Sequence, residues 1–254
     1  MKINCLLVTV LLLIGSISVN AQIAERPWYE EDPDFDNLPP GRYFMGEIGF
    51  QLNFPRGDYK RQNNHVAFGI GGCLAFPIKG IPLYAGLDMN YNIFEFTRTY
   101  EPWNTDGFYG YYDTETFYQI ASIHMLARLQ PEYGPILPYL DFLVGGNFLW
   151  TRSSIDLEDY YDDDSDLSSN YVTFDASWSF GIGIGAMIKI SNYGDDENSD
   201  NGLYLNGGVR AMFGTSAEYA TTENKQILDD EVVYELQRSR TDMYTFRMGI
   251  LFKF

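Results

Sequence analysis

Hydrophobic and polar residues alternate with a period of two along most of the chain that follows residue 42. The clearest stretch is 171–190, where every second residue from Val172 to Ile190 is apolar and the residues between them are mostly small or polar. Successive side chains of a β-strand point to opposite faces. The stretch therefore predicts a strand with one apolar face and one face of small and polar side chains.

Seven further segments repeat this alternation, at 42–54, 65–77, 82–96, 116–129, 136–150, 202–214 and 242–254. The connections between the eight segments alternate between short ones and long ones. The short connections are 79–80 and 131–135, and the long ones are 55–64, 99–115, 151–170 and 215–241. The connection at 191–201 falls on the short side but is unusually long and is the exception to the alternation. Bacterial transmembrane barrels have even strand numbers, short periplasmic turns and long extracellular loops. The pattern predicts an all-β fold, an eight-stranded antiparallel transmembrane β-barrel over residues 42–254 with periplasmic termini.

The N-terminal residues have the features of an export signal. Lys2 precedes an apolar run at 5–14, and Val19 and Ala21 are small residues at the positions that a signal peptidase reads before Gln22. The apolar run is shorter than the ~20 residues of a transmembrane helix. We predict a signal peptide at 1–21 and an acidic, proline-containing periplasmic segment without regular structure at 22–41.

Charge and cysteine content exclude several classes of function. The formal net charge is −18 at pH 7, which argues against nucleic acid as a partner because phosphate binding requires basic surfaces. After removal of residues 1–21 a single cysteine, Cys73, remains, so an internal disulfide is excluded. The acidic stretch 156–166 lacks the glycine and glutamate positions of a calcium-binding EF-hand, and we predict neither a metal site nor a cofactor.

The C-terminal strand carries a pattern of four residues: Arg247, Gly249, Phe252 and Phe254. This pattern resembles the C-terminal signal of bacterial outer-membrane barrels, and the resemblance implies that the barrel-assembly machinery reads it during biogenesis. From residue 42 to residue 254 the chain resembles the small OmpA/OmpX-type outer-membrane barrels of Gram-negative bacteria. The resemblance implies a multi-pass barrel in the outer membrane, in contact with its lipid.

Charged residues occupy the face of the strands that is predicted to point into the barrel. They are Glu47, Asp88, His124, Arg128, Asp141, Arg210 and Arg247. An eight-stranded barrel is just wide enough for side chains to fill it. We interpret these residues as a structural charge network that closes the lumen, with Glu47 and Arg247 in contact where the first and last strands pair; the alternative is a narrow, porin-like channel.

An enzymatic reading rests on His124, Asp141 and Ser122. A turn centred near residues 132–133 would place His124 roughly opposite Asp141, and a His–Asp pair beside a serine is the arrangement of a hydrolase. All three side chains are predicted to face the lumen, and the chain has no G-x-S-x-G motif. We therefore predict no catalytic residues, and a lipid-modifying outer-membrane enzyme is the third alternative.

The loop at 99–113 is rich in aromatic residues, with Trp103, Tyr109, Tyr111 and Tyr112 as contact candidates. Such residues are common at protein interfaces, and they are equally suited to cover the barrel mouth. Our prediction is a closed outer-membrane barrel with a structural or partner-binding role through its acidic and aromatic loops. The partner would be an envelope protein, and a subunit of a secretion or assembly machine is one form of this role.

Overall fold

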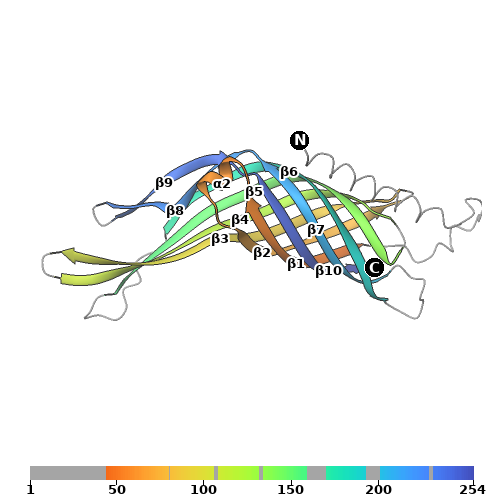
Figure 1. Cartoon of the computed structure of the whole chain (residues 1–254), viewed down its shortest axis with the longest axis horizontal. Helices are drawn as coiled ribbons and strands as arrows, with labels where there is room; N and C mark the ends of the chain where they lie inside the picture. Colours follow the sequence, from red (N-terminus) through yellow and green to blue (C-terminus); the bar gives the residue numbers. More distant parts are fainter. Residues whose placement is uncertain are drawn as a thin grey trace, which may run out of the picture.

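A computed structural model describes residues 44–79, 81–105, 108–131, 134–158, 170–192, 201–228 and 231–254. Eight antiparallel strands form a closed barrel in the order β1-β10-β7-β6-β5-β4-β3-β2 (Figure 1). The strands are β1 (Met45–Pro55), β2 (Ala67–Ile78), β3 (Leu83–Thr105), β4 (Phe108–Leu129), β5 (Ile136–Glu158), β6 (Asn170–Asn192), β7 (Gly202–Gly214) and β10 (Met243–Lys253). The predicted eight-stranded barrel is confirmed. The predicted signal peptide at 1–21 and the acidic segment at 22–41 lie outside the described residues.

Two of the long connections contain regular structure that the alternation did not predict. The connection at 55–64 holds a short helix, α2 (Asp58–Gln62), and the connection at 215–241 forms a two-stranded sheet of β8 (Ser216–Leu228) and β9 (Glu231–Arg240). Both segments are long connections between barrel strands, as predicted, and the sequence analysis assigned no regular structure within them. Within the described part of the chain, no helix has the length and apolarity needed to cross a membrane.

The first and last barrel strands close the sheet. Met45 pairs with Lys253 and Pro55 with Met243, so β1 and β10 are matched along their whole length. Beyond the ladder, the backbone N–H of Phe254 donates to the carbonyl oxygen of Phe44 at 3.0 Å. This pairing removes both edges of the barrel sheet, which an open sheet would leave exposed to other chains.

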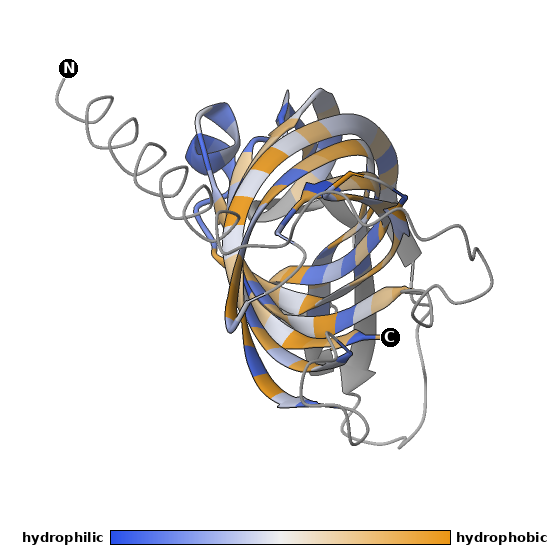
Figure 2. Ribbon diagram, turned by 90° about the vertical axis from the view of Figure 1, so that its right-hand side faces the viewer, coloured by the Kyte–Doolittle hydropathy of each residue, from blue (hydrophilic) through white to orange (hydrophobic). Residues whose placement is uncertain are grey.

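The outer face of the barrel is apolar, and the strand periodicity places it there. Phe50 is 66% exposed, Met125 67% and Trp178 73%, whereas their chain neighbours Gln51, His124 and Ser177 are buried in the lumen. The alternation of hydrophobic and hydrophilic residues is visible along the strands in Figure 2. An apolar surface of this extent on a closed barrel fits hydrocarbon rather than water, and it marks the membrane-facing side.

Four strands are twice as long as the membrane requires. β3, β5 and β6 have 23 residues each and β4 has 22, whereas β1 and β10 have 11. A transmembrane strand needs ~9–11 residues, so the remaining dozen or so residues project by roughly 40 Å. The β3–β4 hairpin extends from the end of the barrel opposite the C-terminus (Figure 1). Much of the backbone predicted as loop at 99–115 and 151–170 thus continues as strand.

Candidate functional site: the barrel lumen and its cap

Three arginines and three acids form a buried layer across the lumen. Arg247 on β10 pairs with Glu47 on β1 (Nε–Oε1, 2.8 Å) and with Asp88 on β3 (Nη1–Oδ2, 2.5 Å). Arg210 on β7 contacts Asp88 and Asp141, at 3.0 Å each. Arg128 on β4 donates two hydrogen bonds to Asp141 on β5, at 2.6 and 2.9 Å, and lies 3.8 Å from Glu47. The layer balances three negative charges with three positive ones.

Inward glycines make room for this layer. The Arg128 guanidinium lies over the ring of Tyr139, with its Cζ 3.9 Å from the ring centroid. A side chain at Gly185 or Gly208 would collide with the hydroxyl end of Tyr139, and one at Gly183 would collide with Arg210. The alternation of glycine with bulky inward residues therefore lets large side chains fill a narrow barrel, as eight strands require.

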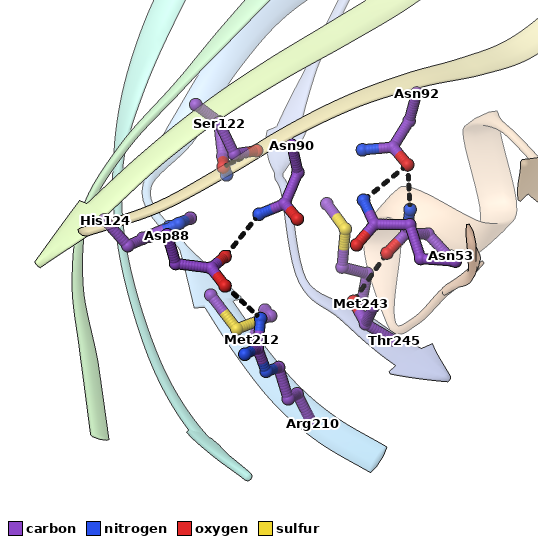
Figure 3. A pocket seen from close by; sticks show the side chains of 12 residues that line it. Asn53, Asp88, Asn90, Asn92, Ser122, His124, Arg210, Met212, Met243 and Thr245 are labelled. Carbon is purple, nitrogen blue, oxygen red and sulfur yellow. Dashed lines mark hydrogen bonds and ion pairs between the residues drawn. The ribbon is translucent and has the colours of Figure 1, made fainter. Parts of the chain in front are cut away.

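A layer of uncharged polar side chains lies on the extracellular side of the charges. Gln51 and Asn53 both donate to the amide oxygen of Asn92, at 2.6 and 2.7 Å, and Asn90 donates to Asp88 at 2.6 Å (Figure 3). These side chains line a cavity with about 20 Å³ of space for the centre of a water molecule. A cavity of this size holds one or two waters, which is too little for an organic ligand.

His124 is part of this polar layer, and its partner is not the predicted one. Its Nε2 lies 2.5 Å from the hydroxyl of Ser179 on β6, while Ser122 donates to Asn147 at 2.8 Å. The register pairs Asp141 with Arg128. The predicted juxtaposition of His124 and Asp141 is wrong because the β4–β5 turn is centred next to Gly134, at a φ of 138°, and not at 132–133.

Aromatic residues from four separate elements, α2, β3, β4 and β8, cover the extracellular mouth. Tyr59 on α2 shares a 2.7 Å hydrogen bond with the hydroxyl of Tyr118 on β4, and its ring lies edge-on to Tyr219 on β8 at 5.3 Å. Tyr219 donates to Gln62 at 2.8 Å and lies 2.7 Å from the hydroxyl of Ser239 on β9. All these tyrosines are buried. We call Tyr59, Phe94, Tyr118 and Tyr219 the aromatic cap.

Burial of the cap changes the acidity of its tyrosines. Burial away from water raises the pKa of Tyr219 to about 12, which its hydrogen bond with Ser239 partly counteracts. Burial also raises the pKa of Tyr59 well above its ordinary value, and the Tyr118 hydroxyl lowers it only in part. The cap therefore requires neutral phenols.

Alternation did not identify Tyr59 or Tyr219 as site residues, because both lie in connections outside the alternating segments. The signal available was an aromatic residue within an otherwise polar stretch, as in DYKRQ at 58–62. The contact candidates Trp103, Tyr109, Tyr111 and Tyr112 lie on the projecting β3–β4 hairpin, where Trp103 pairs with Gly110 and Tyr111 with Pro102. They are therefore on strands rather than on an irregular loop.

The residues of the predicted assembly signal occupy both faces of β10. Arg247 belongs to the charge layer, and Gly249 pairs with Gly49, where a side chain on either would meet the backbone of the other strand. Phe252 and Phe254 alternate with buried Leu251 and Lys253, and the Phe254 ring stacks on Phe44 with centroids 4.8 Å apart. The last aromatic residue thus stabilises the seam of the barrel at its periplasmic end.

No cluster of three or more His, Cys, Asp or Glu side chains with metal-binding geometry occurs among the described residues.

The charge layer and the aromatic cap close the lumen at two successive levels in the described structure, and the small polar cavity lies between them.

Several solved structures align with most of this chain at low sequence identity. Neisserial surface protein A aligns with a TM-score of 0.37 and 14% identity over 83% of this chain and 97% of that one. Ail, the attachment invasion locus protein of Yersinia pestis, aligns with a TM-score of 0.37 and 12% identity over 84% and 99%. The outer membrane protein OprG from Pseudomonas aeruginosa aligns with a TM-score of 0.42 and 14% identity over 84% and 97%. No family model and no curated protein matches the sequence.

The fold is assigned from three features of the chain itself. Its eight strands close on themselves, its membrane-facing side is apolar, and its lumen is filled with buried polar and charged side chains. In a bilayer, only such closure satisfies the backbone hydrogen bonds of strands. The chain is an outer-membrane β-barrel with the fold of the small OmpA/OmpX type.

Proposed function

We propose that the protein is a closed outer-membrane barrel that holds a rigid extracellular projection for contact with a partner of the cell envelope. The observation that carries this proposal is the length of β3, β4, β5 and β6, at 22 to 23 residues. A lumen filled with paired charges contributes little to transport, whereas strands twice the membrane thickness form a platform outside it. The projection includes Trp103, Tyr109, Tyr111 and Tyr112 in its sequence.

The proposal assigns neither conduction nor catalysis to the barrel. Two closures in series support the first point: the layer of Arg128, Arg210 and Arg247 with their acids, and the aromatic cap. The absence of a catalytic role is supported by the hydrogen bonds of the three candidate residues. His124 contacts Ser179, Ser122 donates to Asn147 and Asp141 accepts from Arg128, so the three do not form a hydrolase triad. The barrel-assembly machinery and outer-membrane lipid are the remaining partners that we propose.

A variant with a shortened projection tests the proposed function. Residues 99–114 are replaced by a two-residue Asn-Gly turn between Arg98 and Glu115, which already pair in the register. Folding is checked by the shift in gel mobility between heated and unheated samples. We expect both proteins to fold, and we expect proteins that co-purify with the full chain from detergent-solubilised membranes to be lost from the shortened one.

The control shortens the other hairpin, by replacing residues 216–240 with a Gly-Ser linker, and should leave the co-purifying proteins in place. Loss of partners from both variants would contradict a role of the β3–β4 hairpin. Reproducible ion-selective steps of the full chain in planar bilayers would instead favour the narrow channel.

A further inference from the structure

Arg56 is held on the outer, membrane side of the extracellular rim. It follows the last residue of β1, and its backbone N–H donates to the carbonyl oxygen of Asp242 at 2.9 Å. Its guanidinium Cζ lies 5.0 Å from the ring centroid of Tyr244 on β10 and 5.8 Å from that of Phe213 on β7. Tyr244 lies on the outward face of its strand and is 48% exposed. The two rings therefore direct the cation towards the lipid rather than over the mouth of the barrel.

The nearby acids are engaged elsewhere. The Asp242 carboxylate accepts a hydrogen bond from the backbone of Gly214 at 3.1 Å and pairs with Arg240 at 3.5 Å. Asp58 pairs with Arg61 at 3.2 Å. In the part of the chain that the structure describes, Arg56 has no ion pair, although the net charge of the whole chain is −18. Contact with a ring face uses none of the guanidinium N–H donors, so these donors remain available to an anion.

An apolar surface continues from this cation down the barrel wall. The Phe213 ring stacks on Phe180 with centroids 5.5 Å apart, and Phe180 is 56% exposed. A cation above outward aromatic rings at the end of a transmembrane strand matches a lipid with an anionic headgroup, because the rings contact its acyl chains while the cation meets its phosphate. Arginine is suited to this role since its planar donors fit two phosphate oxygens at once.

We propose that Arg56, positioned by Tyr244 and Phe213, binds the phosphate group of an outer-leaflet lipid at the extracellular rim of the barrel. This site lies outside the lumen and away from the β3–β4 hairpin, so it does not depend on the proposed function.

Lipid binding by the folded protein in detergent tests this assignment. The probes are lipid A that carries both phosphates, lipid A with its phosphates removed, and inorganic phosphate, and bound lipid is counted by native mass spectrometry. Arg56→Gln removes the charge and keeps hydrogen-bonding capacity. We expect it to bind phosphorylated lipid A roughly fivefold more weakly than the unaltered protein, which corresponds to one cation at a membrane surface. Dephosphorylated lipid A should bind both proteins equally.

Two further variants separate this site from a general effect of charge. Arg61→Gln removes an arginine that is 80% exposed and lies on the same connection, and it should bind like the unaltered protein. Tyr244→Leu keeps Arg56 but removes one of the two rings that position it, and like Arg56→Gln it should bind phosphorylated lipid A more weakly than the unaltered protein. This variant also keeps the test valid if Arg56→Gln fails to fold.

Equal binding of phosphorylated and dephosphorylated lipid A by the unaltered protein would overturn the proposal. So would unchanged binding by both Arg56→Gln and Tyr244→Leu, or an equal loss in Arg61→Gln. Full displacement of the lipid by millimolar inorganic phosphate would show a site for free phosphate and would also overturn the assignment to a lipid.

Discussion

Arg247 on β10 reaches across the barrel seam to Glu47 on β1, with its Nε 2.8 Å from Oε1, although the residue directly opposite Arg247 in the register is Gln51. The side chain spans the four positions that separate Gln51 from Glu47. Its Nη1 also contacts Asp88 on β3. Arg247 therefore links the first and last strands to a third strand through one buried cation.

Loss of this cation should destabilise the barrel strongly. Arg247→Gln leaves Glu47 and Asp88 buried with one fewer partner, and we expect a loss of about 3–5 kcal/mol in the free energy of unfolding. Urea unfolding of the refolded protein in detergent measures it. The control is Arg98→Gln, which breaks the exposed pair with Glu115 (3.6 Å) and should cost under about 1 kcal/mol. Equal losses in the two variants would contradict a buried charge layer.

Exchange of the two charges should restore stability only in part. The double variant Glu47→Arg with Arg247→Glu recreates the pair at the seam, but the new carboxylate at 247 then faces Asp88. We expect it to be more stable than Arg247→Glu alone and less stable than the unaltered protein in the same urea titration. A double variant no better than the single one would show that Asp88, rather than Glu47, is the partner that matters.

Removal of the β8–β9 hairpin should not open the barrel to ions. A variant with a short linker in place of residues 216–240 loses Tyr219 and thus a large part of the aromatic cap. The charge layer remains on the periplasmic side of the cap, so we expect planar-bilayer recordings without conductance steps, as for the full chain. Stable conductance steps in this variant would instead identify the cap as the seal.

Alkaline pH should loosen the cap. The pKa of Tyr219 rises on folding from 10.0 to about 12, so its neutral form is favoured in the folded cap. Its contribution to stability is complete below pH 10 and is lost as the pH rises from 10 to 12. Near-ultraviolet circular dichroism should lose its aromatic signal over this range, and tyrosinate absorbance should rise in step. Tyr219→Phe should diminish the late part of the absorbance titration; an unchanged titration would contradict the assignment.

A small side chain at Gly185 should be poorly tolerated. Its Cβ would collide with the hydroxyl end of Tyr139, whereas a Cβ at outward Gly46 meets nothing within 4 Å. We expect Gly185→Ala to lose roughly 1–3 kcal/mol, the usual cost of overpacking, and Gly46→Ala to unfold at the same urea concentration as the unaltered protein.

Phe254 offers a way to separate assembly from stability. Phe254→Asp should reduce the amount of assembled barrel in the outer membrane, because it alters the predicted assembly signal and also the stacking on Phe44. Phe44→Asp removes the same stacking but leaves the C-terminal residues intact. We expect a larger loss of assembled protein for Phe254→Asp, measured by heat-dependent gel mobility of membrane fractions. Equal losses would show that only the stacking matters.

Alternation predicted the barrel because one physical requirement acts on every membrane-spanning residue: apolar outward, small or polar inward. Phe50 and Gln51, or Trp178 and Ser177, are assigned to their faces by sequence alone, and the structure confirms both pairs. The requirement ends where the membrane ends. β8 and β9 lie beyond the membrane, where lipid no longer requires an outward apolar face, so their sequence shows no sustained two-residue alternation, and the hairpin was missed.

Contacts in the lumen were harder to predict than faces, since they depend on register. A displacement of the β4–β5 turn by two residues moved Asp141 from His124 to Arg128. The turn residue Gly134 was visible in the sequence, but its positive φ was not. The contact of Glu47 and Arg247 was predicted despite similar uncertainty, because a long arginine side chain covers several positions.

The seam between β1 and β10 also imposes an order of events on biogenesis. Seven of the eight strand pairs join barrel strands that follow one another along the chain and can form as soon as the second strand appears, whereas β1 pairs with β10 only when residues up to Lys253 have been delivered. Until then both β1 and β7 present a bare row of backbone donors and acceptors, because each pairs with β10 on one side. Such long-range pairing is slow, so the exported chain spends a waiting time exposed to self-association in the periplasm. The time for which the chain needs protection from self-association therefore depends on when β10 arrives.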